Sequence, residues 1–245
     1  MIVFIVPLKS AKYAKSWELT STLFERTLRS ICGQTCNDFH IVVVCNEKPN
    51  INFNTQFVEY VEVDLPIPVG EWFIGHKDMS KKLTIGLERS KQLSPSHVMA
   101  VDADDLISNK IAEFVKKNSE QTGWIINRGY IHEFQNKYLY YLRKDFGQYC
   151  GSSVIIKPDL FNCLFIEEDF YDHRCTSLPA HEIVLNNIPF CGAIYSRANG
   201  ENNLAVAPFY KDIVPKANLI ANLKHLTRFR LITSQIRKEF GFYEI

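Results

Sequence analysis

Residues 96–107, SHVMAVDADDLI, decide the fold, because an apolar run of strand length ends there in three carboxylates within four residues. Such a run is typical of a buried strand that delivers acids to the edge of a sheet. Alternation along an extended chain would put Asp102 and Asp104 on one side, with Ala103 facing away. In an open α/β sheet, ligands bind outside the carboxyl ends of the strands. Carboxylate oxygens suit Mg²⁺ or Mn²⁺, which bind through one or two carboxylates, water and a substrate's phosphates.

Part of this cluster also has a structural interpretation. Asp105 could cap the amino end of a helix that runs through Ile111 to Lys117, because aspartate is a favoured capping residue. A calcium loop of the EF-hand type would need a longer ladder of acids, a central glycine and a closing glutamate, and the sequence lacks them.

Composition describes an ordinary globular chain. The 245 residues are 46% hydrophobic and carry a formal net charge of +1, so nothing global indicates nucleic-acid binding. The amino-terminal run, residues 2–6, is too short for a signal peptide, and no stretch approaches a membrane span. We therefore expect a cytoplasmic protein. Its seven cysteines lack paired C-x-x-C spacing, which favours reduced, mostly buried thiols over a zinc site or a disulfide frame.

The first 115 residues contain alternating strand and helix patterns. Continuous apolar runs predict strands, and apolar residues at helical spacing predict helices. In chain order we expect a strand at 2–6, a helix at 19–31, strands at 40–45 and 57–65, a helix at 80–91 and the acid-bearing strand at 96–101. This order predicts an α/β fold with a mostly parallel, doubly wound sheet and helices on both faces.

Polar residues follow three of these strands. Pro7 and Lys9 follow the first, Asn46 with Glu47 follows the second, and the aspartates follow the last. Because the carboxyl ends of parallel strands meet at one rim, these residues predict a nucleotide-binding crevice. The sequence has no G-x-G-x-x-G after the first strand and no Walker A loop, which excludes the usual dinucleotide and P-loop sites.

These motifs together resemble glycosyltransferase family 2, of the GT-A fold. Members open with an apolar strand ending in proline, continue with a helix closing on Ser-x-x-x-Gln-Thr before an apolar strand, and then carry a basic helix start, a Gly-Leu pair and an Asp-x-Asp motif. The matching residues here are 5–7 (IVP), 30–35 (SICGQT), 81–82 (KK), 86–87 (GL) and 102–104 (DAD). The resemblance covers about residues 2 to 110.

The resemblance implies a set of roles. Asp104 and Asp102 would hold Mn²⁺ or Mg²⁺ on the diphosphate of a nucleotide sugar, and Lys82 would assist. The second strand departs from the family, because many relatives end it in acidic residues that hold the nucleoside, whereas this chain has Asn46 and Glu47. Asn46 and Glu47 would still contact the nucleoside, and the sequence leaves open which base they prefer.

The second half carries weaker patterns. Strands are predicted at 124–127 and 150–156, and the aromatic run 138–141 favours a hydrophobic hairpin over a sugar-stacking surface. By resemblance, the family's catalytic base at the start of a helix would be Glu182, and the loop with Arg197 and residues 200–202 would follow it. Glu167-Glu168-Asp169 is a competing location, which makes Asp169 the alternative base. His181 could complete the metal shell, as a distal histidine often does in GT-A enzymes.

The carboxyl-terminal segment changes character. From residue 215 on, basic residues alternate with apolar ones, which predicts a basic amphipathic helical tail. Most such helices pack on their own domain, and a peripheral contact with the inner membrane surface is the alternative. The expected organisation is therefore a nucleotide-sugar-binding half at 1–115, an acceptor-side half of the same GT-A domain at 116–214, and the tail at 215–245.

The expected activity is transfer of a hexosyl group from a nucleotide diphosphate sugar to a glycan or lipid-linked acceptor. By resemblance the reaction is metal-dependent and inverting. Two alternatives stay open. A haloacid-dehalogenase-like phosphatase also uses Asp-x-Asp after a strand, although on its first strand. A non-catalytic sugar-nucleotide-binding protein would keep the metal site and lack a working base.

Overall fold

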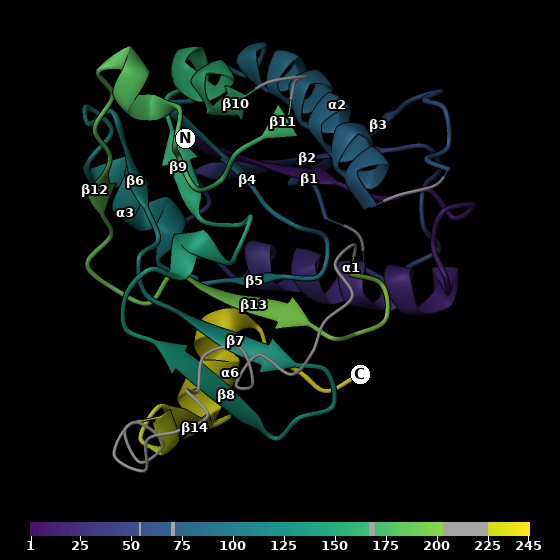
Figure 1. Cartoon of the computed structure of the whole chain (residues 1–245), viewed down its shortest axis with the longest axis vertical. Helices are drawn as coiled ribbons and strands as arrows, with labels where there is room; N and C mark the ends of the chain where they lie inside the picture. Colours follow the sequence, from purple (N-terminus) through teal and green to yellow (C-terminus); the bar gives the residue numbers. More distant parts are fainter. Residues whose placement is uncertain (54, 70–71, 167–169, 203–224) are drawn as a thin grey trace.

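A seven-stranded sheet forms the centre of the computed structural model, which describes residues 1–53, 55–69, 72–166, 170–202 and 225–245 (Figure 1). Its strands, in spatial order, are β12 (Asn186–Asn187), β6 (Gly123–Ile125), β9 (Val154–Ile156), β4 (His97–Ala100), β1 (Ile2–Pro7), β2 (Phe39–Cys45) and β3 (Val58–Glu62). β9 pairs antiparallel with both of its neighbours, and every other pairing in this sheet is parallel. The predicted mostly parallel α/β sheet is therefore confirmed.

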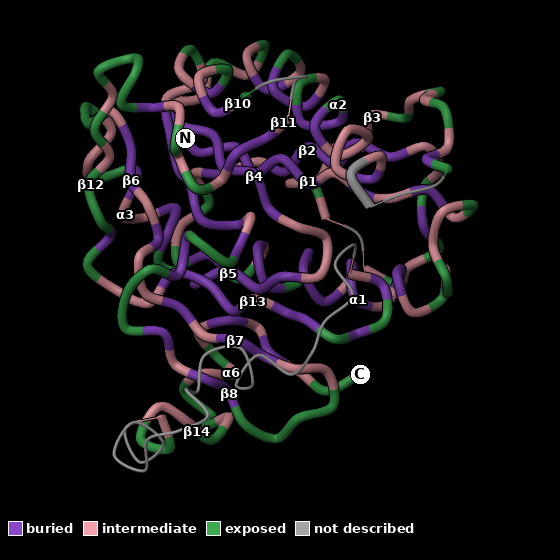
Figure 2. Tube along the Cα trace, viewed as in Figure 1, coloured by how far each residue is buried: buried purple, intermediate pink, exposed green. Residues whose placement is uncertain are grey.

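The central strands are almost entirely buried and mostly apolar, because both faces of the sheet are covered (Figure 2). In β1, alternate residues pack into two different clusters, Ile2, Phe4 and Val6 on one face, Val3 and Ile5 on the other. Helices α1 (Trp17–Cys32) and α3 (Ile111–Lys117) supply the first cluster, and α2 (Trp72–Lys91) with the short helix η2 (Pro158–Leu164) supplies the second. The side chains thus follow the two-residue period of a strand.

Helix α2 lies very close to the sheet at Gly86. A Cβ atom on Gly86 would lie 2.3 Å from the Ile5 side chain and 3.2 Å from the Val44 side chain. Only glycine permits this approach, which explains the Gly-Leu pair physically. Leu87 beside it is fully buried in the same cluster.

A second sheet packs below the first and shares its core (Figure 1). Its strands are, in order, β14 (Phe229–Leu231), β8 (Tyr138–Leu142), β7 (Gly129–Glu133), β13 (Ala193–Arg197) and β5 (Leu106–Ile107). β7 and β8 form the hairpin predicted from the aromatic run. β5 follows the aspartates directly, so this sheet forms the other wall behind them.

Shorter elements complete the described chain. They are the strands β10 (Phe165–Ile166) and β11 (Phe170–Tyr171), the helices η1 (Phe146–Gln148) and η4 (Leu178–His181), and the carboxyl-terminal helix α6 (Ser234–Phe240). Two of the seven cysteines, Cys45 and Cys150, are buried and the other five are partly buried.

The structure corrects three expectations about elements. The second long helix begins at Trp72, eight residues before the predicted start at 80. Residues 183–202, the described stretch after Glu182, contain no helix, and Glu182 itself ends η4 in a left-handed conformation with φ 57°. Within residues 225–245 the tail forms β14 and α6 instead of one amphipathic helix, because Phe240 and Phe242 pack against Leu106 and Leu139 of the domain. Residues 203–224 lie outside the described chain. Among the described helices, none combines the length and apolar character that crossing a membrane requires.

Candidate active site

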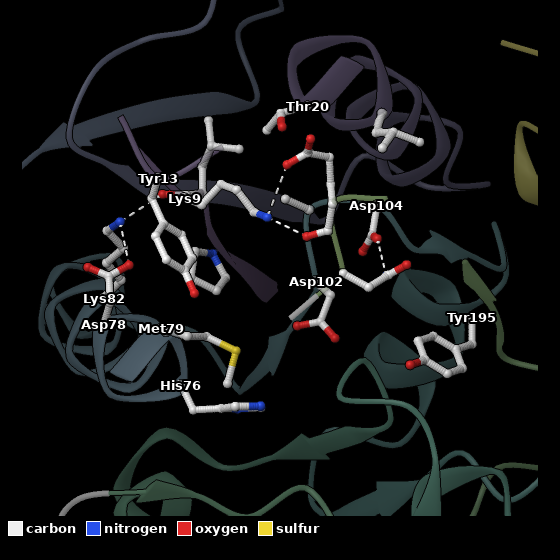
Figure 3. Close-up of a pocket in the computed structure, with 17 residues that line it drawn as sticks. Lys9, Tyr13, Thr20, His76, Asp78, Met79, Lys82, Asp102, Asp104 and Tyr195 are labelled. Carbon is white, nitrogen blue, oxygen red and sulfur yellow. Dashed lines mark hydrogen bonds and ion pairs between the residues drawn. The ribbon is translucent and has the colours of Figure 1, made fainter. Parts of the chain in front are cut away.

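A cleft opens at the carboxyl ends of β1 and β4, where the parallel strands deliver their following residues (Figure 3). Asp102 and Asp104 line it from the turn after β4, and Lys9 lines it from the loop after β1. α2 contributes a wall, and the loop after β13 closes the side behind Asp104. The lining includes Pro7, Leu8, Lys9, Tyr13, Thr20, His76, Asp78, Met79, Lys82, Asp102, Ala103, Asp104, Tyr195, Glu201 and Asn202.

The two aspartates lie in an environment that disfavours their charge. Burial, and then the negative charge of Asp104, raise the pKa of Asp102 to about 7. Burial also raises the pKa of Asp104, although the amide of Asn199 and the positive charges of Lys9 and Arg26 oppose the shift. A bound cation would stabilise the negative charge of both carboxylates and so lower their pKa values.

Asp105 supports the turn from behind. Its buried carboxylate accepts hydrogen bonds from Ser152 Oγ at 2.7 Å and from the Ser196 backbone N–H at 2.8 Å. Ser152 Oγ in turn accepts from the Asp102 N–H at 2.8 Å. The expectation that Asp105 caps the helix at 111–117 is wrong, because the capping position is Lys110. Asp105 instead ties the aspartate turn to β13 and to the segment before β9.

The Ser-x-x-x-Gln-Thr motif at the end of α1 holds the chain that follows the aspartates. Ser30 Oγ accepts from the Ile107 N–H at 2.8 Å and donates to the Ile107 carbonyl at 3.1 Å. Gln34 donates through Nε2 to the Ser108 carbonyl at 3.0 Å and accepts through Oε1 from the Ala112 N–H at 2.8 Å. These polar side chains are buried and satisfied, so the motif fixes β5 and α3 behind the cleft.

The two lysines named from the sequence differ in environment. Lys9 Nζ donates to the Glu201 carbonyl and approaches the Glu201 carboxylate at 3.4 Å, beside the opening of the cleft. Lys82 Nζ is fully buried and donates to the Leu8 carbonyl at 2.9 Å and to Asp78 at 2.8 Å. Lys82 thus joins α2 to the end of β1, and Lys9 is the more available cation.

Asn46 and Glu47 do not line the cleft. Asn46 Nδ2 donates to the Leu65 carbonyl at 2.9 Å. The Glu47 carboxylate accepts from Ser10 Oγ at 2.9 Å and from the Ala11 N–H. Both side chains therefore organise neighbouring loops, and the expected nucleoside contact has no support in their geometry.

The acids expected to supply the base lie apart from this cleft or outside the described chain. Glu182 and His181 are exposed at the end of η4 and are absent from the lining. Asp169 lies outside the described residues. Phe170, which follows Asp169 in sequence, packs against His76 in the cleft wall with ring centroids 5.0 Å apart.

The residues present fit a divalent cation held by two carboxylates. Within the described ranges, no group of three or more His, Cys, Asp or Glu side chains could hold a metal, so His181 does not complete a shell with Asp102 and Asp104. Water and ligand oxygens would have to supply the remaining positions. Mg²⁺ is commonly held in this way, through one or two carboxylates and substrate phosphates.

Several lining residues were not identified from the sequence. Tyr13 in the loop after β1, His76 on α2 and Tyr195 on β13 carry no motif, and they meet in the cleft only through the tertiary packing of these segments. The resemblance identified residues 200–202 only as part of a loop with Arg197, and Asn199 was not identified. Nothing in the sequence indicated that the amides of this loop would face Asp104.

Comparisons with known proteins identify the fold. No family model matches the chain, and no curated protein matches it. Among solved structures, residues 1–349 of S. aureus TarS in complex with UDP-GlcNAc align with 97% of this chain and 69% of that one, at a TM-score of 0.52 and 14% identity. TarS 1–349 alone aligns at a TM-score of 0.50 and 13% identity, over 80% of this chain. The chain spans 60% of that TarS chain. This likeness shows that the chain shares the fold of TarS residues 1–349.

Proposed function

We propose that this chain is a metal-dependent glycosyltransferase that moves a hexosyl group from a nucleotide diphosphate sugar to a glycan or lipid-linked acceptor. The observation that carries the proposal is the pairing of Asp102 and Asp104 with Lys9 in one cleft at the carboxyl ends of parallel strands. The fold supports it as well, because TarS shares this architecture and was solved with UDP and with UDP-GlcNAc.

The proposed roles follow from charge. Asp102 and Asp104 would hold Mg²⁺ or Mn²⁺, which when bound neutralises negative charge that develops on a diphosphate leaving group. Lys9 would add a direct positive charge on the same oxygens, because it lies at the opening of the cleft. Lys82 would act indirectly by holding the end of β1 through the Leu8 carbonyl.

Two acids are candidates for the catalytic base. An inverting displacement requires a base for the attacking hydroxyl, worth about 10² to 10⁴ in rate. Glu182 is the base that the resemblance implies, yet it is exposed and outside the cleft lining. Asp169, the alternative, lies outside the described residues, so the choice between the two acids depends on experiment. We expect Asp169→Asn or Glu182→Gln, but not both, to lower transfer at least about a hundredfold while leaving donor binding close to normal.

A panel of nucleotide sugars tests the proposal. Incubation with Mn²⁺ should give slow hydrolysis of one donor, and Asp104→Asn should abolish it. Release of phosphate from monoesters, with every nucleotide sugar left intact, would instead indicate a phosphatase. Binding of a donor without turnover, even with a panel of acceptors, would indicate a sugar-nucleotide-binding protein.

A peripheral membrane contact remains part of the proposal. Leu226 and Leu231 are both 64% exposed, and Arg228 and Arg230 lie between them along and beside β14. Exposed apolar residues with cations fit an anionic lipid surface. The protein should co-sediment with phosphatidylserine vesicles in a salt-sensitive way, and the double change Leu226→Ser with Leu231→Ser should end this. Co-sedimentation that is unaffected by the double change contradicts this surface.

A further inference from the structure

The loop after β13 holds Asp104 from a separate part of the chain. Asn199 Nδ2 donates to Asp104 Oδ2 at 2.7 Å, and Asn202 Nδ2 donates to the same oxygen at 2.9 Å. Asn202 Nδ2 also donates to the Ser196 carbonyl at 3.1 Å. One carboxylate oxygen therefore receives two amide donors that lie 95 and 98 residues away in sequence.

The orientation of both amides is fixed by their other ends. Asn199 Oδ1 accepts from the backbone N–H groups of Glu201 and Asn202, at 2.9 and 3.1 Å. Asn202 Oδ1 accepts from the Asn199 N–H at 3.2 Å. A backbone N–H can only donate, so each side-chain oxygen must face the loop and each NH₂ group must face Asp104.

This arrangement separates the roles of the two Asp104 oxygens. Oδ2 is committed to the amides, so Oδ1 is the oxygen left to meet a ligand in the cleft. The amides also restrict rotation of the carboxylate, and Asn199 is only 4% exposed, which keeps water from competing for its donor.

The same loop sets the position of Lys9. The buried Glu201 carboxylate accepts from the Ser16 N–H at 2.7 Å and the Lys15 N–H at 3.1 Å, and the Glu201 carbonyl accepts from Lys9 Nζ. Ala198 and Gly200 adopt left-handed conformations, with φ of 58° and 85°, that turn the chain between these contacts. One short loop thus orients an acid and a cation on two walls of the cleft.

We propose that Asn199 and Asn202 are positioning residues that aim Asp104 Oδ1 at a divalent cation and thereby set which cation the cleft prefers. This inference rests on the proposed metal site. Mg²⁺ requires nearly ideal octahedral geometry, whereas Ca²⁺ accepts irregular shells. A carboxylate that is free to rotate would therefore cost Mg²⁺ and Mn²⁺ more affinity than Ca²⁺. Residues that orient a metal ligand typically contribute about 10- to 100-fold in metal affinity.

The test measures binding of Mn²⁺ alone, from the electron paramagnetic resonance signal of the free ion, with Mg²⁺ and Ca²⁺ as competitors. Asn199→Ala and Asn202→Ala should each weaken Mn²⁺ and Mg²⁺ binding about tenfold or more and Ca²⁺ binding less than about threefold. Asn118→Ala is the matched control, because the Asn118 amide donates to the Phe114 carbonyl at the end of α3, outside the cleft. It should leave all three affinities unchanged.

Three results would overturn the inference in distinguishable ways. Unchanged affinities in both asparagine variants would show that the amides do not position Asp104, and the metal site would stand. An equal loss for all three ions, with a lowered thermal midpoint, would assign the loop a structural role only. If the wild-type protein binds no Mn²⁺, the proposed metal site is wrong, and so is this inference. Asn202, which is less buried than Asn199, keeps the test open if Asn199→Ala does not fold.

Discussion

Gly151 lies against the carboxylate of Asp102. A Cβ atom at position 151 would lie 2.6 Å from Asp102 Oδ2, and the φ of Gly151 is not in the left-handed region that L-residues avoid. Gly151→Ala should therefore displace the carboxylate without straining the backbone. We expect the apparent affinity for Mn²⁺ to fall about tenfold or more while the thermal midpoint changes little. An affinity equal to wild type would show that Asp102 does not need this position to bind metal.

The lowered pKa of buried His132 makes the stability of the protein depend on pH. Burial lowers the pKa of His132 to about 4, from 6.5 in the unfolded chain. As pH falls below 6.5 the unfolded chain takes up a proton that the folded chain refuses, so stability is complete above 6.5 and declines until about 4. The loss amounts to about 3 kcal/mol at most. His132→Gln should flatten the dependence of the unfolding free energy on pH between 4 and 6.5, measured by urea denaturation. Parallel curves for variant and wild type would contradict this.

At the residue scale, the sequence predicted cleft residues correctly where their position at the end of a strand places them in the cleft. Pro7 ends a strand with a clear apolar run, and Lys9, Asp102 and Asp104 follow such strands. All four residues line the cleft. Asn46 and Glu47 follow an equally clear strand but turn to Leu65 and to the loop at 10–11. Which way a side chain turns after its strand depends on neighbouring loops, and periodicity carries no information about them.

Helix α2 offers a test of helix-to-sheet packing at Gly86. An added methyl group would lie 2.3 Å from the Ile5 side chain, and overpacking of this kind costs about 1–3 kcal/mol. Alanine gains up to about 1 kcal/mol of helix propensity over glycine, so the clash should outweigh the gain. We expect Gly86→Ala to lower the free energy of unfolding by urea. A variant as stable as wild type would mean that Ile5 rotates away at no cost.

Elements with a clear apolar pattern were predictable, and the shortest strands were not. Continuous apolar strands and helices with a clear apolar face gave β1, β2, β4 and α1 to within two residues. The two-residue strands β5 and β12 are held by pairing with distant segments and carry no pattern of their own. The tail was mispredicted for a similar reason. Within residues 225–245, Leu231 lies in β14 whereas Ile236 and Phe240 lie in α6, so the apolar pattern does not belong to one helix.

At the scale of the whole molecule, the carboxyl-terminal segment completes the domain. Phe240 and Phe242 are buried against the second sheet, and Glu239 accepts from Ser108 Oγ and pairs with Lys110 at 2.9 Å. Burying each phenylalanine contributes about 1.5–3 kcal/mol. Deletion of residues 234–245 should therefore destabilise or unfold the protein in the absence of any membrane, as measured by urea denaturation. Lys238→Gln, an exposed change in the same helix, is the control and should have little effect. Unchanged stability on deletion would show that the tail is a separate appendage that does not stabilise the domain.

The central proposal is that Asp102 and Asp104 hold a metal ion that assists nucleotide binding. Isothermal titration of UDP with Mn²⁺, and again with a chelator, tests it directly. We predict at least about tenfold tighter binding with Mn²⁺, and loss of that difference in Asp104→Asn with the fold intact. The exposed Asp159→Asn should behave as wild type. Equal UDP affinity with and without metal in the wild-type protein, or a full metal effect in Asp104→Asn, would contradict the account.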